Sequence, residues 1–212
     1  MMAVVLTIAQ QKGGAGKTML AAHLGVAFAA GRRVALLDID PQKSLTRWFA
    51  LRAARPPGKD LAPLGFSDVS GWRLGAELDR LKRDFDLIII DSPPQIATDA
   101  RTALRAADLV LVPIQPSPPD LWAAEGTLAL AASERRAAHL VFNRASAASR
   151  LRQTMAAEIA ERGLSLLAGA LGNRAGFANA FARGLGIGEA APNSRAGTEL
   201  AALAAEIDGF LA

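Results

Sequence analysis

A glycine-rich loop between an apolar run and a helix-like stretch constrains this chain more than any other feature. The loop reads K-G-G-A-G-K-T over residues 12–18, after the apolar residues 3–9 and at the start of a helix-like stretch. Glycines let backbone N–H groups converge on phosphate oxygens, and the N-terminus of the following helix adds positive potential. The loop therefore predicts a polyphosphate site at a strand-to-helix turn.

Different residues of the loop are suited to bind different parts of a nucleotide. Gly13, Gly14 and Gly16 supply backbone freedom. Lys17 supplies a charge for the β- and γ-phosphates, and the Thr18 hydroxyl is a ligand for Mg²⁺. A second lysine, Lys12, opens the loop. One loop uses one phosphate lysine, so Lys12 requires a separate explanation.

Strand and helix signals alternate along the whole chain. The strand-like segments are residues 4–9, 33–39, 87–90, 109–114, 140–143 and, more weakly, 164–170, with a short edge strand at 65–69 inside an irregular connection over 55–71. The helix-like segments are residues 18–30, 43–54, 72–84, 98–107, 120–133, 149–162 and 198–211, and residues 169–192 read as loops around a short helix. This alternation predicts an α/β fold over 1–212, a single domain with a mostly parallel twisted sheet and helices on both faces.

Composition excludes several classes of protein. The chain has no cysteine, which removes disulfides, thiolate metal sites and iron–sulfur ligation. Its two histidines, His23 and His139, are far apart and lack metal-ligand spacing. No apolar run reaches the roughly 18 residues of a membrane span, and the start lacks the basic region of a signal peptide. We expect a cytoplasmic protein.

An acidic residue ends the most apolar strand. The run L-I-I-I-D ends at Asp91 and matches the Walker B arrangement, in which the carboxylate holds Mg²⁺ through a water. The alternative is an ordinary turn aspartate at a strand end. Ser92, Pro93 and Pro94 then form a stiff turn where a γ-phosphate sensor would lie.

Two further aspartates, Asp38 and Asp40, lie one residue apart at the end of another strand. Phosphoryl transfer to water requires a group that orients the nucleophile, and we assign that role to Asp40. Asp38 is expected to support the loop or the metal shell. For both residues the alternative is capping of the strand end, and it suits Asp38 better.

Together with Lys12, these segments resemble the deviant Walker A ATPases, the family that includes ParA and MinD. The resemblance rests on K-G-G-x-G-K-T, on D-x-D-P-Q at residues 38–42 and on the strand ending in Asp91, and it extends over essentially the whole chain. It implies a P-loop NTPase fold and a nucleotide sandwiched between two subunits. It also implies that Lys12 reaches the phosphates of the partner, so that a homodimer forms in the ATP state.

The nucleotide base is expected to be adenine. A GTP site usually carries Asn-Lys-x-Asp after a strand, whereas residues 141–146 read V-F-N-R-A-S and lack the aspartate. The resemblance places Asn143 against adenine and completes the nucleotide site with Ala15 and Met19. Relatives usually have a second hydroxyl where this chain has Met19, so we expect weaker nucleotide affinity with the Mg²⁺ ligand retained.

This sequence lacks features that mark several members of the family, which limits the members that it resembles. Residues 198–212 carry three acids and no base, unlike the basic amphipathic helix that attaches MinD-type proteins to membranes. The chain has no tyrosine cluster of the related kinases. The larger plasmid ParA proteins carry an N-terminal DNA-binding helix-turn-helix domain, whereas here the sheet is expected to start at residue 3. The resemblance that remains is to small, single-domain ParA proteins, which partition plasmids or position protein cargo.

Arginine is concentrated late in the chain. Between residues 135 and 195 there are nine arginines and three acids, and every lysine lies at or before Lys82. On composition alone, a DNA surface and the solvated surface of a protein from a GC-rich genome are equally good explanations; the resemblance favours sequence-independent DNA binding. The candidates are Arg150, Arg152, Arg174, Arg183 and Arg195, whereas Arg135, Arg136 and Arg162 read as solvated helix faces.

The sequence therefore predicts a nucleoid-associated ATPase that positions cargo. ATP and Mg²⁺ join two subunits, the dimer binds nonspecific DNA, and a cargo adaptor or centromere-binding protein stimulates an otherwise weak hydrolysis at Asp40. Two alternatives stay open: a metabolic ATP-dependent ligase or amidoligase of the same superfamily, and a nucleotide-dependent switch that does not hydrolyse. The sequence does not distinguish a plasmid, a chemoreceptor cluster and a microcompartment as the cargo.

Overall fold

A seven-stranded parallel sheet forms the centre of the molecule. The computed structural model describes residues 3–55, 61–94, 98–146 and 149–211. Its strand order is β3-β2-β4-β1-β5-β6-β7, and every strand pair in it is parallel. The strands are β1 (Val4–Ile8), β2 (Val34–Asp38), β3 (Leu64–Asp68), β4 (Leu87–Asp91), β5 (Leu109–Ile114), β6 (Ala137–Phe142) and β7 (Leu166–Ala170).

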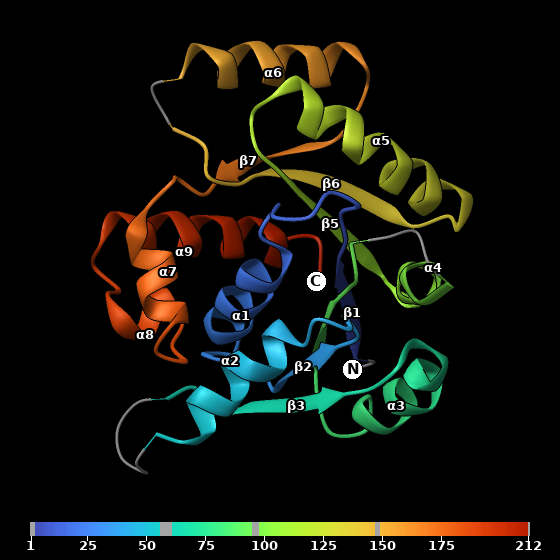
Figure 1. Cartoon of the computed structure of the whole chain (residues 1–212), viewed down its shortest axis with the longest axis vertical. Coiled ribbons are helices and arrows are strands. Elements are labelled where there is room, and N and C mark those ends of the chain that lie inside the picture. Colours follow the sequence, from blue (N-terminus) through green and yellow to red (C-terminus); the bar gives the residue numbers. More distant parts are fainter. Residues whose placement is uncertain (1–2, 56–60, 95–97, 147–148, 212) are drawn as a thin grey trace.

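Helices cover both faces of this sheet (Figure 1). One face carries α1 (Lys17–Phe28), α2 (Ser44–Ala53), α7 (Ala175–Phe181), α8 (Ile187–Ala190) and α9 (Arg195–Asp208). The other carries α3 (Leu74–Leu81), α4 (Thr98–Ala106), α5 (Pro118–Ser133) and α6 (Arg150–Glu161). The expected α/β architecture is confirmed.

Alternation along the strands explains why both faces are apolar. Side chains on a strand point to opposite faces in turn, so a strand covered on both sides must be apolar at every position. In β1, Leu6 and Ile8 pack toward α1, while Val5 packs toward α3. All five residues of β4 are buried, Asp91 included.

Most of the expected elements are present, with one error. The edge strand at 65–69 is confirmed as β3, at one end of the strand order. The interpretation of 169–192 as loops around one short helix is wrong, because that stretch contains both α7 and α8. Helices of seven and four residues are too short to show a 3.6-residue period in the sequence. Pro56, Pro57 and Gly58 of the expected irregular connection lie outside the described residues.

Helix α1 is buried almost all round. Nine of its twelve residues are buried, including the histidine at its centre. A helix without a polar face belongs inside a protein, and here α1 lies between the sheet and the helices α2, α7, α8 and α9. In the part of the chain that the structure describes, no helix is long and apolar enough to cross a bilayer.

Candidate functional site

Neighbouring strands bring the sequence motifs together at one edge of the sheet. Asp91 at the end of β4 is in register with Asp38 of β2 on one side and with Ile8 of β1 on the other. The carboxyl ends of parallel strands are where such sheets bind ligands. A cavity of about 330 Å³ opens there, lined by Gly13, Gly14, Gly16, Lys17, Thr18, Met19, Asp40, Gln42, Ser44, Pro94, Arg144 and Phe181.

The loop before α1 is shaped to present backbone amides. Gly14 and Gly16 have φ values of 79° and 92°, in the left-handed region that glycine adopts without strain. The amides from Gly13 to Met19 donate no hydrogen bond to any other residue that the structure describes. Such a row of free N–H groups at a helix N-terminus forms an anion site.

The Asn143 side chain stabilises this loop through a hydrogen bond to its backbone. Its Nδ2 donates to the carbonyl oxygen of Ala15 at 2.8 Å, and its Oδ1 accepts from the amide of Arg144 at 3.0 Å. A Cβ added at Gly16 would lie 2.3 Å from this Nδ2, so the loop requires glycine there. Both polar groups of the side chain are engaged by backbone, and its contact with adenine stays a prediction.

Lys17 and Asp91 form the charged base of the site. Burial lowers the pKa of Lys17, while Asp91 and Asp40 act in the opposite direction. Burial, together with the charges of Asp38 and Asp40, raises the pKa of Asp91 to about 7, against the opposing effects of the Thr18 hydroxyl and Lys17. Neither carboxylate oxygen of Asp91 has a partner in hydrogen-bonding geometry among the described residues, although the Thr18 hydroxyl lies near enough to lower the pKa.

An unpartnered buried carboxylate is the arrangement expected of a cation site without its cation. Among the described residues, no group of three His, Cys, Asp or Glu side chains could hold a metal. Mg²⁺ usually keeps several waters and takes one or two protein oxygens plus phosphate oxygens. Asp91 and Thr18 fit that requirement together with a bound polyphosphate, and the ion would neutralise phosphate charge there.

Replacing Asp91 with asparagine is expected to stabilise the protein in the absence of nucleotide and metal. Because the pKa of Asp91 is raised, the folded chain holds a proton that the unfolded chain releases, so stability falls as pH rises from about 4 to about 7. Asp91→Asn removes this dependence and gains about 2–4 kcal/mol at pH 8. Thermal unfolding in EDTA across pH 4–8 measures it; equal pH dependence in both proteins would contradict the assignment.

Asp38 and Asp40 have separate positions. Asp38 is fully buried and accepts from the Asp40 amide at 3.0 Å, the Thr46 amide at 2.9 Å and the Thr46 hydroxyl at 2.7 Å. It therefore caps the strand end and the start of α2. Asp40 lines the cavity, with Oδ1 accepting from the amide of Gln42 at 2.9 Å. Its role in orienting water stays a prediction.

Lys12 lies outside the cavity and is paired within its own subunit. Its Nζ is 2.6 Å from Oδ2 of Asp120 in the first turn of α5; the Lys12 side chain is 40% exposed and that of Asp120 is 4% exposed. Ser117 Oγ donates to the same carboxylate at 2.6 Å. Although burial opposes them, these bonds hold the pKa of Asp120 below its usual range.

Sequence analysis missed Asp120 as a site residue. The only signal was an acid three residues after Ser117, which is the N-cap of α5, and that pattern alone indicates a helix start.

The five candidate DNA-binding arginines lie in or beside helices from opposite faces of the sheet. Arg150 and Arg152 belong to α6, whereas Arg174, Arg183 and Arg195 flank or join α7, α8 and α9. Arg174 is paired with Glu199, its Nε 2.8 Å from Oε2. Arg183 and Arg195 are exposed, and neither has an ion pair within the described ranges.

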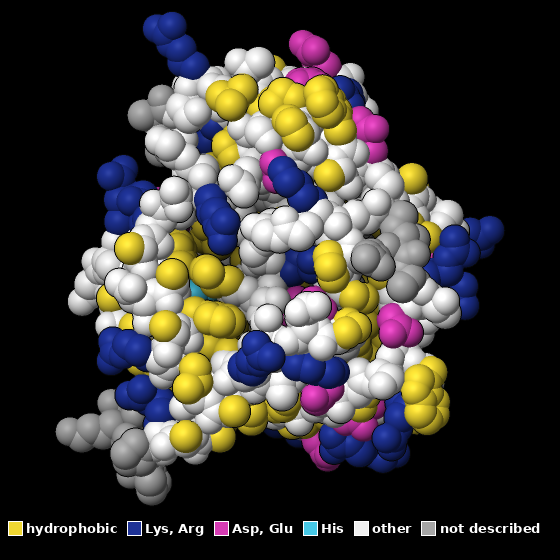
Figure 2. All heavy atoms as spheres, viewed as in Figure 1, with side chains coloured by type: hydrophobic (Ala, Val, Ile, Leu, Met, Phe, Trp, Pro, Cys, Tyr) yellow, Lys and Arg dark blue, Asp and Glu magenta, His cyan; other side chains and the backbone are white. Residues whose placement is uncertain are grey.

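Cations do not form one stripe on the visible face of the molecule. Figure 2 shows lysine and arginine side chains spread around that face, several beside acidic groups. Arg162 is an example, with Nη1 2.7 Å from Glu125 and a second pair with Glu158. Exposed arginines that form no ion pair within the described residues are therefore the better DNA candidates.

Comparisons with known proteins agree with this geometry. A family model described as the CobQ/CobB/MinD/ParA nucleotide binding domain matches residues 6–187. The chain is 29% identical over 191 residues to the maintenance of carboxysome distribution protein A of Halothiobacillus neapolitanus, covering 87% of each chain. It is 31% identical over 186 residues to protein ParA of Rhizobium radiobacter, covering 84% of this chain and 82% of that one.

Solved structures show the same fold at low identity. The cell division ATPase MinD of Pyrococcus furiosus superposes with a TM-score of 0.83 at 21% identity, covering 99% of this chain and 100% of that one. Cobyrinic acid a,c-diamide synthase of Mycobacterium smegmatis, with a bound ATP analogue and magnesium, gives 0.78 at 21% identity, covering 96% and 93%.

Proposed function

The chain belongs to the CobQ/CobB/MinD/ParA family of nucleotide-binding proteins and is an ATPase, and on that premise we propose that it positions cargo as a small ParA-type protein. Residues 1–212 act as one domain. Mg²⁺-ATP joins two subunits, the dimer binds nonspecific DNA of the nucleoid in the cytoplasm, and a partner on the cargo stimulates hydrolysis. The relative named for carboxysome distribution makes a microcompartment one candidate cargo. The relative named ParA makes a plasmid the other.

The position of Lys12 carries this proposal. Lys17 already lines the phosphate cavity, whereas Lys12 is held beside it on Asp120 and is partly exposed. A cation that its own site does not use can serve a second polyphosphate brought up by a partner subunit. Two phosphate sites facing each other require such extra cations, which makes association depend on the nucleotide.

The described residues supply the parts of hydrolysis. Lys17 and the loop amides would hold the phosphates, and Thr18 and Asp91 would hold the Mg²⁺, which would offset phosphate charge. Asp40 accepts a hydrogen bond from the attacking water and orients it. Such positioning, together with charge stabilisation, accounts for most of the catalysis in phosphoryl transfer.

Sedimentation and DNA mobility shift under matched nucleotide conditions test the proposal. We expect monomers without DNA binding when the protein is alone or with ADP, and DNA-bound dimers with Mg²⁺-ATP. A metabolic ligase of the same family would not shift DNA under any of these conditions. Phosphate release measured with DNA and the partner separates the ATPase from a switch that does not hydrolyse.

Charge reversal at the exposed arginines is expected to weaken DNA binding selectively. Arg183→Glu and Arg195→Glu should each lower the slope of log affinity against log salt by about 0.9 for every phosphate that the side chain no longer neutralises. Arg162→Glu is the matched control, because Glu125 and Glu158 already engage that side chain. An equal loss of affinity in the control would mean that the effect reflects net charge alone.

A further inference from the structure

Both helices that begin at the nucleotide site contact one short segment near the end of the chain. Helix α1 begins at Lys17 directly after the phosphate loop, and α2 begins at Ser44 shortly after Asp40. The segment comprises α7, α8 and the connection between them, residues 175–190, hereafter the α7–α8 segment. Each helix contacts it through a buried polar side chain.

The contact with α1 is made by His23. The ring is 1% exposed; its Nε2 lies 3.2 Å from the carbonyl oxygen of Phe177 in α7, and its Nδ1 accepts from the amide of Ile187 in α8 at 3.0 Å. These bonds require the neutral tautomer with hydrogen on Nε2. Burial lowers the pKa of His23 to about 4, against the effects of Phe177 and Glu189, so that tautomer persists. One side chain of α1 therefore links α7 to α8.

The contact with α2 is an ion pair. The side chains of Arg52 and Glu189 are 5% and 9% exposed, with Nη2 and Oε1 2.6 Å apart and Nη1 and Oε2 2.8 Å apart. Arg52 also donates to the carbonyl oxygens of Gly184 and Ala62, and Glu189 accepts from the amides of Gly186 and Ala62. Removing one partner of a buried pair leaves the other charge uncompensated, so the ends of α2 and α8 stay together.

Glycines let the segment approach both helices closely. Gly184 has φ 67°, and a Cβ there would lie 2.4 Å from the backbone nitrogen of Arg52 in α2. A Cβ at Gly186 would lie 2.6 Å from Cβ of Val26 in α1. The connection between α7 and α8 is therefore in close contact with both helices, so a displacement of either helix would move it.

The same segment reaches the nucleotide cavity and the arginine-rich surface. Phe181 at the end of α7 lines the cavity and stacks on Trp48 of α2, with ring centroids 6.1 Å apart. Arg183 lies in the connection, and Arg174 and Arg195 flank the segment on either side. A displacement of the segment would therefore move cations as well.

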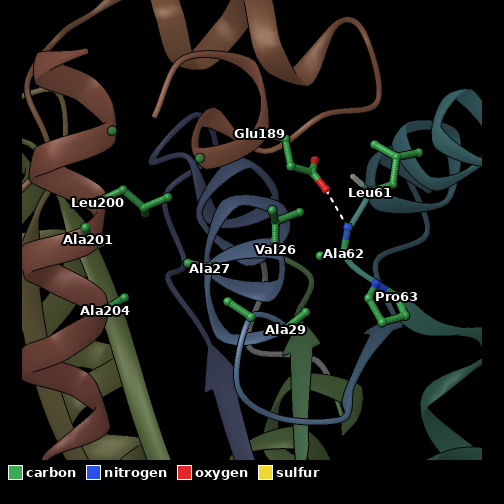
Figure 3. Close-up of a pocket in the computed structure, with 13 residues that line it drawn as sticks. Val26, Ala27, Ala29, Leu61, Ala62, Pro63, Glu189, Leu200, Ala201 and Ala204 are labelled. Carbon is green, nitrogen blue, oxygen red and sulfur yellow. Dashed lines mark hydrogen bonds between the residues drawn. The ribbon is translucent and has the colours of Figure 1, made fainter. Parts of the chain in front are cut away.

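An apolar cavity of about 640 Å³ beside the segment provides room for such a displacement. Figure 3 shows it between α1, α9 and residues 61–63, with Glu189 reaching over it to the amide of Ala62. Its walls include several small residues, among them Ala27, Ala201 and Ala204. A densely packed interior resists motion, whereas α8 borders space that no described side chain fills.

We propose that His23, Arg52 and Glu189 are positioning residues that transmit nucleotide occupancy from α1 and α2 to the α7–α8 segment. Mg²⁺-ATP fixes the first turn of α1 and the loop containing Asp40, and the two buried contacts carry that change to the segment. The consequence of this coupling for DNA binding rests on the proposed function, in which the arginines in and beside the segment bind DNA. The position of the segment would then set the position of those arginines. Coupling between the nucleotide site and the DNA-binding surface requires a structural element whose conformational equilibrium both sites shift.

Amide hydrogen exchange tests the coupling without DNA. In the unaltered protein, a non-hydrolysable ATP analogue with Mg²⁺ is expected to slow exchange in residues 175–190 by about tenfold, as for a typical coupling between sites. In Arg52→Lys and His23→Leu, protection of α1 should persist while the change in the segment falls below about twofold. His23→Gln can still donate to Phe177 and accept from Ile187, so it should restore most of the coupling.

A stability control separates coupling from folding. Met155→Ala removes buried volume on the opposite face of the sheet and should lower the melting temperature without reducing the nucleotide effect on the segment. The inference would be overturned if the analogue did not change hydrogen exchange in the segment of the unaltered protein. It would also be overturned if folded Arg52→Lys and His23→Leu showed the full change in exchange. If the segment responds as expected but ATP induces no DNA binding, the proposed function fails and the coupling stands.

Discussion

Replacing Lys12 with alanine is expected to abolish ATP-dependent dimerisation while each subunit still binds Mg²⁺-ATP. Lys12 does not line the phosphate cavity, and its amino group lies 2.6 Å from Asp120 in its own subunit. Its loss therefore removes little from the site that the subunit itself provides. In the dimer it would remove one cation from each of two buried phosphate sites, and loss of a buried charge partner costs about 2–5 kcal/mol. The dimer dissociation constant should rise by at least about 100-fold.

Two measurements on the same protein check this expectation. Isothermal titration calorimetry gives nucleotide affinity for the monomer, and sedimentation equilibrium gives the dimer constant with the non-hydrolysable analogue. Asp120→Asn is the matched control, because it weakens the hold on Lys12 and should leave dimerisation equal or tighter. A Lys12→Ala protein that dimerises with wild-type affinity would rule out the role of Lys12 in the partner's site.

Replacing Asp40 with alanine is expected to trap the ATP dimer on DNA. Asp40 lies at the cavity wall and would orient the attacking water, while Lys17, Thr18 and Asp91 remain to bind Mg²⁺-ATP. Loss of a positioned acid–base group typically slows a reaction by about 10²–10⁴-fold. Partner-stimulated phosphate release should therefore fall by at least about 100-fold, and DNA binding should persist after the partner is added.

Asp38→Asn is the control for Asp40→Ala because the two aspartates are neighbours with different contacts. Asp38 accepts three hydrogen bonds at the start of α2, and an amide oxygen replaces them only in part. We expect a loss of about 1–3 kcal/mol in unfolding free energy, visible as a lower melting temperature. Asp40→Ala gives up one such bond, from the Gln42 amide, and should lower the melting temperature less; if it hydrolyses ATP at the normal rate under stimulation, another group orients the water.

The phosphate loop, the alternating elements and the edge strand β3 could all be predicted because their signals are local. A glycine pattern, an apolar run and a terminal carboxylate each occupy fewer than about ten consecutive residues, which is the scale on which periodicity and turn chemistry act. Parallel strands then bring the ends of β2, β4 and β1 together without further information. For this reason Asp40, Asp91 and the loop could be placed near one another from the sequence.

Contacts across the fold could not be predicted in the same way. Arg52 and Glu189 are 137 positions apart, and Lys12 and Asp120 are 108 apart. No local pattern links the members of either pair, so their pairing follows only from the way helices pack on the finished sheet. Asn143 shows a related difficulty: the resemblance predicts a contact with adenine, which stays a prediction, and the contact with the carbonyl of Ala15 depends on the tight turn at Gly16.

The unpartnered carboxylate of Asp91 also links the stability of the fold to nucleotide binding. Without its cation, the folded chain holds a buried carboxyl that no described residue hydrogen-bonds, so binding of Mg²⁺-ATP should stabilise the fold. Nucleotide at about 100 times its dissociation constant adds roughly 2.7 kcal/mol to the folded state. Chains without nucleotide should therefore unfold at a lower temperature than chains with bound Mg²⁺-ATP.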